Sequence, residues 1–200
     1  MRLAIIPILL ILSSCEPIFA AESQKALASI FGHEGGYQCL HNDSGNWTGG
    51  KVGKGVLKGT KFGIAAASYP KVDIKNLTLA TASLYYERDF WNPLVLTGLK
   101  SQGLATTILD TAVNCGMGTA AILVEKTCNI LNGNGADYPL NARIDRNMVN
   151  WINAYTKPRE QRVLFYLVFE ALRSERYVAI ARADKRKRAY LDNWLIRTWE

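Results

Sequence analysis

Apolar residues recur at helical spacing along most of the chain that follows residue 20. The first stripe consists of Leu27, Ile30 and Phe31, whose spacing predicts an amphipathic helix over residues 21–31. The same spacing predicts four more helices, with Thr78 as an N-cap and glycines as two of the helix ends. These helices are expected over residues 77–90, 104–115, 120–131 and 143–155. The pattern therefore predicts a mainly α (α+β) fold.

Two segments depart from this periodicity. Residues 163–169 are apolar on every side, which predicts a helix buried around its whole circumference. That run is too short to span a bilayer. Between residues 35 and 63, glycines and polar residues replace the helical pattern, so a small β-hairpin or loop lobe is expected there.

Glu34 is the first candidate for chemistry. It lies three and four positions after Phe31 and Ile30, on the buried face of the first predicted helix. Burial raises the pKa of a carboxyl group, as a general acid requires near neutral pH. The pair Gly35-Gly36 is expected to end the helix and to let a bulky polymer approach. The alternative is a charged helix end with an ordinary glycine cap, which is the commoner meaning of so short a motif.

Asp43 is the second candidate. The residues Asn42-Asp43-Ser44-Gly45 favour a turn, and a turn that returns over the helix end would bring this carboxylate near Glu34. One group would then protonate a glycosidic oxygen while the other activates or orients water. A wide gap between the two predicts inversion at the sugar, and a narrow gap predicts retention. A solvated turn aspartate is the alternative.

The order of several motifs resembles glycoside hydrolase family 108, which contains bacterial and phage N-acetylmuramidases related to phage-type lysozymes. The resemblance covers most of the chain after the N-terminal segment. The motifs, in order, are Glu34-Gly35-Gly36-Tyr37, Asp43, Gly59-Thr60-Lys61-Phe62-Gly63-Ile64, Tyr69-Pro70, Asp73-Ile74, Asp89-Phe90-Trp91, Asp110-Thr111-Ala112-Val113-Asn114-Cys115-Gly116 and Trp194-Leu195-Ile196-Arg197.

This resemblance implies that Glu34 is the catalytic acid and that Asp43 and Thr60 handle water. The segment between Asp43 and Thr60 is longer than is usual in the family and contains a second candidate, Thr48. Thr60 is preferred because it directly precedes Lys61, as the family threonine does. A structural threonine remains the alternative at either position.

The resemblance also implies a lysozyme-like helical body with a small lobe that bears the active site. Residues 21–92 would form the catalytic muramidase region. Residues 93–200 would form a helical C-terminal region that is predicted to bind peptidoglycan and to pack into the same globular unit. The aromatic residues Tyr37, Trp47 and Phe62 are candidates to stack on sugars, with core packing as the alternative. Trp47 has few apolar neighbours in the sequence, which favours a role in binding.

Other chemistries fit this segment less well. Residues 45–52 nearly match the phosphate-binding loop motif. The motif requires Ser or Thr after Gly50-Lys51, and Val52 at that position has no hydroxyl to bind magnesium. His33 could open a zinc-binding helix, yet Tyr37 stands where the second histidine is required. The chain contains only two histidines, which disfavours a metal site around Cys39. No metal or organic cofactor is expected.

The first twenty residues are expected to direct export. Arg2 precedes an apolar run of about ten residues, as in a secretory signal. Residues 12–15 resemble a bacterial lipobox, so Cys15 is a candidate for lipidation and a membrane tether. Cleavage after Ala20 and an uncleaved anchor are the alternatives. Each route leads to the periplasm, the outer membrane or the exterior, and what remains is long enough for one globular domain.

Export makes the other cysteines, Cys39, Cys115 and Cys128, candidates for disulfides, with buried free thiols as the alternative. In the helical region, Asp110 and Asn114 lie one turn apart, so they are expected to hydrogen-bond in the core or to line a cleft.

The net charge is +7, with a basic run at residues 185–188. It favours polyanionic partners such as a cell wall, although a solvated helix face is the commonest explanation of such a run. Export argues against nucleic acid, and a monomer is expected.

The combined prediction is an exported or lipid-anchored muramidase that hydrolyses the β-1,4 bond between N-acetylmuramic acid and N-acetylglucosamine. A lytic transglycosylase is one alternative, because the same acid can serve it. The other is a non-catalytic wall-binding or secretion-accessory protein. The biological setting is left open between phage lysis, wall remodelling, wall opening for secretion and attack on a competitor.

Overall fold

The computed structural model describes residues 20–33, 36–133, 135 and 137–198. Within this part of the chain, seven α-helices and one antiparallel pair of short strands form the regular structure, which confirms the mainly α prediction. The α-helices are α1 (Ser23–His33), α2 (Leu79–Tyr86), α3 (Gln102–Cys115), α4 (Met117–Leu131), α5 (Arg146–Tyr155), α6 (Arg159–Ala183) and α7 (Leu191–Ile196). The other elements are strands β1 (Thr60–Lys61) and β2 (Ile64–Ala65), the 3-10 helices Ser44–Asn46, Leu96–Gly98 and Lys185–Tyr190, and the π-helical turn Glu87–Trp91.

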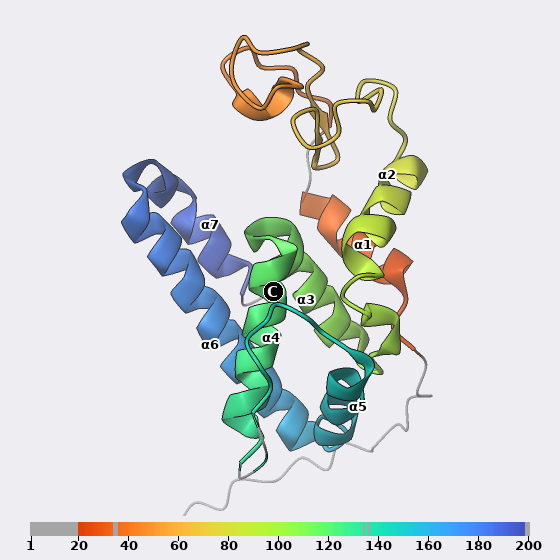
Figure 1. Ribbon diagram of the computed structural model, residues 1–200, viewed down its shortest axis with the longest axis vertical. Helices are drawn as coiled ribbons and strands as arrows, with labels where there is room; N and C mark the ends of the chain where they lie inside the picture. Colours follow the sequence, from red (N-terminus) through yellow and green to blue (C-terminus); the bar gives the residue numbers. More distant parts are fainter. Residues whose placement is uncertain (1–19, 34–35, 134, 136, 199–200) are drawn as a thin grey trace, which may run out of the picture.

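The α-helices form a helical body with α3 and α4 at its centre (Figure 1). These two helices are joined at Gly116, whose φ of +89° suits glycine and lets the chain reverse. α1 packs against α3, α6 packs against α4, and α7 packs against α6. The body has the lysozyme-like arrangement that the sequence resemblance implied, with a small lobe attached at one end.

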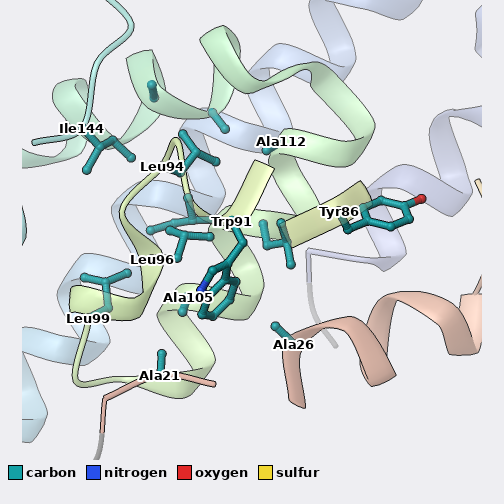
Figure 2. Packing of buried hydrophobic residues seen from close by; sticks show 14 of the residues in the cluster. Ala21, Ala26, Tyr86, Trp91, Leu94, Leu96, Leu99, Ala105, Ala112 and Ile144 are labelled. Carbon is teal, nitrogen blue, oxygen red and sulfur yellow. The ribbon is translucent and has the colours of Figure 1, made fainter. Parts of the chain in front are cut away.

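Apolar side chains from most of these helices meet in one continuous core. Figure 2 shows Trp91 near the centre of the residues drawn, beside Ala105 of α3 and close to Leu96. The indole N–H of Trp91 donates to the hydroxyl of Thr97 at 2.7 Å, so its one polar atom is satisfied inside the core.

The helix starts follow from capping side chains. Thr78, Ser101 and Asp145 each accept a hydrogen bond from a backbone N–H three residues later, at the starts of α2, α3 and α5. Thr78 was predicted as a cap, and its role is confirmed. The predicted helix over residues 77–90 is in fact α2 followed directly by the π-helical turn.

The prediction that residues 163–169 are buried on all sides is wrong. Phe165 and Phe169 are fully buried, but Val163, Leu164 and Leu167 are 48%, 46% and 61% exposed. The two phenylalanines lie four residues apart and so share the face of α6 that turns inward. α6 is a long surface helix with one buried stripe.

The glycine-rich lobe (residues 36–76) lies beyond the ends of the helices in Figure 1. Its short sheet pairs Thr60 with Ala65 and Lys61 with Ile64. Two isolated bridges, Gln38 with Thr60 and Trp47 with Leu57, add further main-chain pairing.

Gly59 is required where the lobe's chain segments cross. Its φ is +84°, and a side chain there would place a Cβ atom 2.3 Å from the carbonyl oxygen of Gln38. Only glycine allows this close approach of the two backbones.

Cys39, Cys115 and Cys128 are free thiols, so the buried-thiol alternative holds for Cys128 and no disulfide joins these three. Burial raises the pKa of the Cys128 thiol to about 12, which keeps it protonated at neutral pH. The described helices include none that combines the length and the apolar character needed to cross a bilayer.

Candidate active site

The helix that leads to Glu34 has the predicted buried face. Leu27 and Ile30 are each 1% exposed, and Phe31 packs edge-on against Tyr86 at 5.4 Å between ring centroids. α1 ends at His33. Glu34 itself lies outside the described residues, so its role as the acid stays a prediction.

Asp43 begins the turn that the sequence predicted. It is the N-cap of the 3-10 helix Ser44–Asn46, and its Oδ1 accepts a hydrogen bond from the backbone N–H of Gly45 at 2.9 Å. The rest of the residue is exposed. This arrangement fixes one carboxylate oxygen against the backbone and leaves the side chain accessible to water.

Thr60 is joined to the same turn through Asn46. The Thr60 hydroxyl donates to Asn46 Oδ1 at 2.7 Å, and the Asn46 amide nitrogen donates to the carbonyl of Leu40 at 3.1 Å. The backbone N–H of Asn46 donates to the carbonyl of Asp43 at 3.2 Å. Because Asn46 is completely buried, these bonds are made away from competing solvent. Asn46 thus fixes Thr60 relative to the turn that carries Asp43.

Asn46 is a site residue that the sequence pattern does not reveal. It lies in a polar, glycine-containing turn, where asparagine is common because it bonds nearby backbone groups. Nothing in the pattern distinguishes it from the exposed Asn42. Its importance follows from burial and from its partners, which are distant in sequence from one another.

The second threonine candidate, Thr48, has a different role. Its hydroxyl accepts a hydrogen bond from the backbone N–H of Val56 at 2.9 Å, and its own N–H donates to the carbonyl of Val56 at 3.0 Å. These bonds close the loop between residues 48 and 56. Of the two threonines, Thr60 is the one whose hydroxyl is bonded to the turn of Asp43.

Thr60 is also paired with the segment that follows Glu34. The backbone groups of Gln38 and Thr60 exchange two hydrogen bonds, each 2.8 Å long. Gln38 is only four residues after Glu34 in the sequence. The chain that leaves the candidate acid is therefore fixed to the strand of the candidate threonine, and through Asn46 to the turn of Asp43.

The three aromatic candidates lie around this arrangement with different surroundings. Tyr37 is 39% exposed, and its hydroxyl donates to the carbonyl of Lys58 at 3.2 Å. The Trp47 indole N–H donates to the carbonyl of His41 at 2.8 Å, and the two rings meet edge-on.

Phe62 contacts the helical body. Its ring lies edge-on to Phe31 of α1 at 6.2 Å, and its carbonyl accepts a hydrogen bond from the Tyr86 hydroxyl at 3.0 Å. Tyr37 is the most accessible of the three aromatic candidates, and Phe62 packs at the junction of the lobe and the body.

Among the residues that the structure describes, no three His, Cys, Asp or Glu side chains gather as metal ligands would. The described part of the candidate site consists of the Asp43 carboxylate, the Thr60 hydroxyl and the buried Asn46. The Asn46 side chain bonds to Thr60, and its backbone N–H bonds to the carbonyl of Asp43. Such groups can orient and deprotonate water, and they resemble the water-handling half of an acid-catalysed hydrolysis site.

A mainly helical body with a small polar lobe and this set of side chains is an architecture suited to a glycoside hydrolase. Residues 27–116 match the family described as glycosyl hydrolase 108, and this match supports membership in glycoside hydrolase family 108. The matched segment runs from α1 through the lobe to the end of α3, and it contains Glu34, Asp43 and Thr60. No curated protein matches the chain.

Proposed function

We propose that this glycoside hydrolase is an N-acetylmuramidase, which hydrolyses the β-1,4 bond between N-acetylmuramic acid and N-acetylglucosamine in peptidoglycan. Glu34 is the general acid, and Asp43 and Thr60 position and activate water. The observation that carries the proposal is the bonding of Thr60 through Asn46 to the turn of Asp43, within a segment that matches the family.

The hydrogen bond of Thr60 supports its role toward water. Because the hydroxyl proton is directed at Asn46 Oδ1, the remaining lone pairs of the Thr60 oxygen can accept a hydrogen bond from water. The exposed carboxylate of Asp43 can accept the water's other proton. A water molecule held by both acceptors presents its own lone pair to the anomeric carbon.

The reaction then proceeds by a balanced transfer of protons. Glu34 donates its proton to the glycosidic oxygen as the bond from that oxygen to the anomeric carbon breaks. The water oxygen bonds to the anomeric carbon, and the Asp43 carboxylate takes the water's proton. Glu34 and Asp43 return to their starting states by exchanging protons with solvent.

Two near-isosteric substitutions test these roles in the full chain acting on purified peptidoglycan. Glu34→Gln removes the titrating acid and is expected to reduce turnover by at least about a thousandfold, within the range that acid catalysis and charge stabilisation supply together. Asp43→Asn keeps the oxygen that caps the turn but loses the charge, and a smaller loss of about 10- to 100-fold is expected. Circular dichroism should show wild-type helix content for both variants.

The products distinguish this reaction from its alternatives. Hydrolysis leaves a reducing N-acetylmuramic acid end, whereas a lytic transglycosylase leaves an anhydro sugar that is lighter by one water, so mass spectrometry separates the two. The anomeric form of the fresh product reports inversion or retention. Wild-type turnover in Glu34→Gln would remove that residue from the mechanism, and a purified protein without turnover would favour a wall-binding role.

We also propose that the N-terminal segment directs the enzyme out of the cytoplasm, with Cys15 as a site of lipidation. Both lie outside the described residues. Labelling of the expressed protein with a radioactive fatty acid tests this proposal, because Cys15→Ser should abolish label incorporation. Equal labelling of the two proteins would exclude lipidation at Cys15.

A further inference from the structure

A cavity of about 670 Å³ lies between α1, α3, α6 and the end of α7, and none of its lining residues belongs to the glycine-rich lobe. Its volume is in the range of sites that hold small molecules, roughly 300–1,000 Å³. Ser29 contributes from α1, Gly103 from α3, and Tyr166, Leu167 and Ala171 from α6. The wall therefore combines apolar surface with hydroxyl groups.

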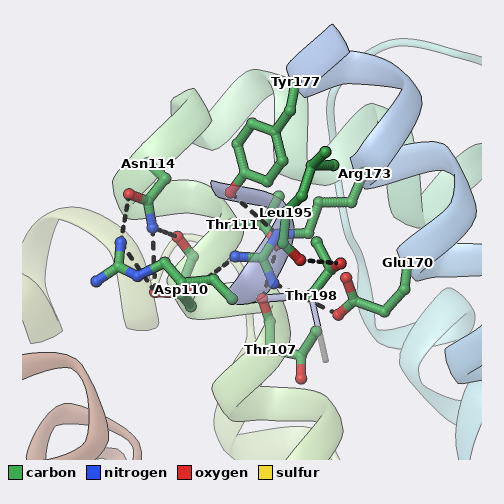
Figure 3. A network of polar contacts seen from close by, with 10 residues as sticks. Thr107, Asp110, Thr111, Asn114, Glu170, Arg173, Tyr177, Leu195 and Thr198 are labelled. Atoms are coloured by element: carbon green, nitrogen blue, oxygen red, sulfur yellow. Dashed lines mark hydrogen bonds and ion pairs between the residues drawn. The ribbon is translucent and has the colours of Figure 1, made fainter. Parts of the chain in front are cut away.

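One side of the cavity is built from a charged cluster (Figure 3). Arg173 is 1% exposed, and its guanidinium pairs closely with Asp110 of α3. It also donates to the Tyr177 hydroxyl at 3.1 Å. Asp110 has further support, since Asn114 donates to it at 3.1 Å and Arg197 lies 3.9 Å from it. The charge of Asp110 is thus well compensated.

Glu170, which also lines the cavity, is not compensated in the same way. Its Oε1 accepts only a long bond of 3.4 Å from Arg173, whose closer partner is Asp110. Its Oε2 is buried and has no hydrogen-bond partner within the part of the chain that the structure describes. An unpaired buried acceptor is costly, and natural sites usually satisfy it with a ligand, an ion or water. Asp110 therefore has two cationic neighbours, Arg173 and Arg197, whereas among the described residues Glu170 has an ion pair with Arg173 alone.

We propose that this cavity binds an aliphatic primary amine, whose ammonium group donates to Oε2 of Glu170 while its carbon stem lies against Leu167 and Ala171. The ammonium group supplies both the missing donor and the missing positive charge. A carboxylate ligand would bring a like charge to Glu170, and an alcohol would leave the charge uncompensated. The site is independent of the proposed glycan hydrolysis.

The titration of Glu170 should make the affinity for the amine depend on pH. Burial raises the pKa of Glu170 to about 7, and Arg173 opposes that shift only in part. The charged groups around it are Arg173 on its own helix, Asp110 on α3 and Arg197 after α7, while the α1 residue Ser29 carries no charge. Burial also raises the pKa values of Tyr166 and Tyr177, so neither phenol titrates near pH 7.

The test uses n-hexylamine with n-hexanoate and n-hexanol as matched probes, and isothermal titration calorimetry on the full chain. Because the amine pairs with ionised Glu170, its affinity should rise about tenfold between pH 6 and pH 8, given a pKa of about 7. Hexanoate and hexanol should bind at least about tenfold more weakly at pH 8, the factor expected from loss of one charge-assisted hydrogen bond.

Three variants complete the test. Glu170→Gln should lower amine affinity by at least about tenfold and abolish its pH dependence, because the amide carries no charge. Glu175→Gln, at an exposed position on the same helix, should leave amine binding unchanged. Ala171→Trp, which adds a bulky side chain to the cavity, should weaken binding of the amine without changing the charge of Glu170.

The source of the amine is tested with two further ligands. Tighter binding of Nα-acetyl-lysine amide would indicate a peptide side chain, and tighter binding of 1,5-diaminopentane would indicate a free diamine.

Equal binding of hexanoate, or amine affinity that Glu170→Gln leaves intact, would overturn the proposal. Glu34→Gln should bind hexylamine as the wild type does. Loss of wall hydrolysis in that variant and loss of amine binding in Glu170→Gln are therefore separate results, and either proposal can fail alone.

Discussion

The glycine-rich lobe and the helical body are held together by different forces. In the lobe, individual polar side chains fix the backbone, as when Asn46 bonds to Leu40 and Thr60 or when Thr48 closes its own loop. In the body, α3, α4 and α6 bury apolar faces against one another. The shape of the lobe depends on single hydrogen bonds, whereas the body depends on summed apolar area, so substitutions in the two regions should have different consequences.

The largest effect is expected in the body, from Phe165→Ala. Phe165 is completely buried, and removing its ring should lower the free energy of unfolding by about 3–5 kcal/mol. Leu164→Ala is the control, because Leu164 is 46% exposed and should cost less than about 1 kcal/mol. Urea denaturation followed by circular dichroism measures both. Similar losses at the two positions would show that α6 is buried on both faces after all.

A smaller effect, which depends on pH, is expected from the charged cluster of the body. Folding raises the pKa of Glu170 from its ordinary 4.5 to about 7, so between these pH values the folded protein holds a proton that the unfolded chain has released. The free energy of unfolding should therefore fall as pH rises through this window, by up to about 3 kcal/mol from this group. Glu170→Gln should lose that dependence in thermal unfolding between pH 5 and pH 8. A parallel decline in wild type and variant would assign the effect to other groups.

The smallest difference in stability within a pair of variants is expected in the lobe, between Gly59→Ala and Gly50→Ala. A methyl group at Gly59 would lie 2.3 Å from the Gln38 carbonyl oxygen, whereas one at Gly50 meets nothing within 4 Å. Both glycines have positive φ, so Gly50→Ala controls for backbone strain alone. We expect Gly59→Ala to destabilise the protein by about 1–3 kcal/mol more than Gly50→Ala, the usual cost of overpacking.

Peptidoglycan turnover is a second measurement that should distinguish the same two variants. Gly59→Ala should lose most activity because it separates Gln38 from Thr60, while Gly50→Ala should retain it. Hydrogen exchange at the Gln38 and Thr60 amides, which exchange two hydrogen bonds with each other, locates the change in the lobe. Unchanged exchange at both amides in Gly59→Ala would show that the lobe tolerates the methyl group.

The helices could largely be predicted from the sequence, because apolar periodicity and capping side chains act over a few residues. Thr78 caps α2 as predicted, and the glycine after Cys115 ends α3 as predicted. The prediction for residues 163–169 failed because a run of apolar side chains does not reveal which face is covered. Burial there is decided by the elements packed against α6, and Phe165 and Phe169 are the residues of this segment that they bury completely.

The site could be predicted only in its outline. The turn at Asp43 followed from local residues, and the match to family 108 followed from the order of motifs. Asn46 was missed because its partners, Leu40 and Thr60, come from separate segments. The pair Asp110 and Asn114 was expected either to bond in the core or to line a cleft, and the structure shows that Asp110 does both.

The ion pair between Asp110 and Arg173 crosses the boundary of the family match, since Asp110 lies inside residues 27–116 and Arg173 lies beyond them. A fragment that ends at Gly116 would keep the aspartate without its guanidinium and would uncover the face of α3 that packs against α4. The matched segment is consequently not expected to fold as an independent unit. A design that transfers this lobe to another scaffold should include the later helices as well.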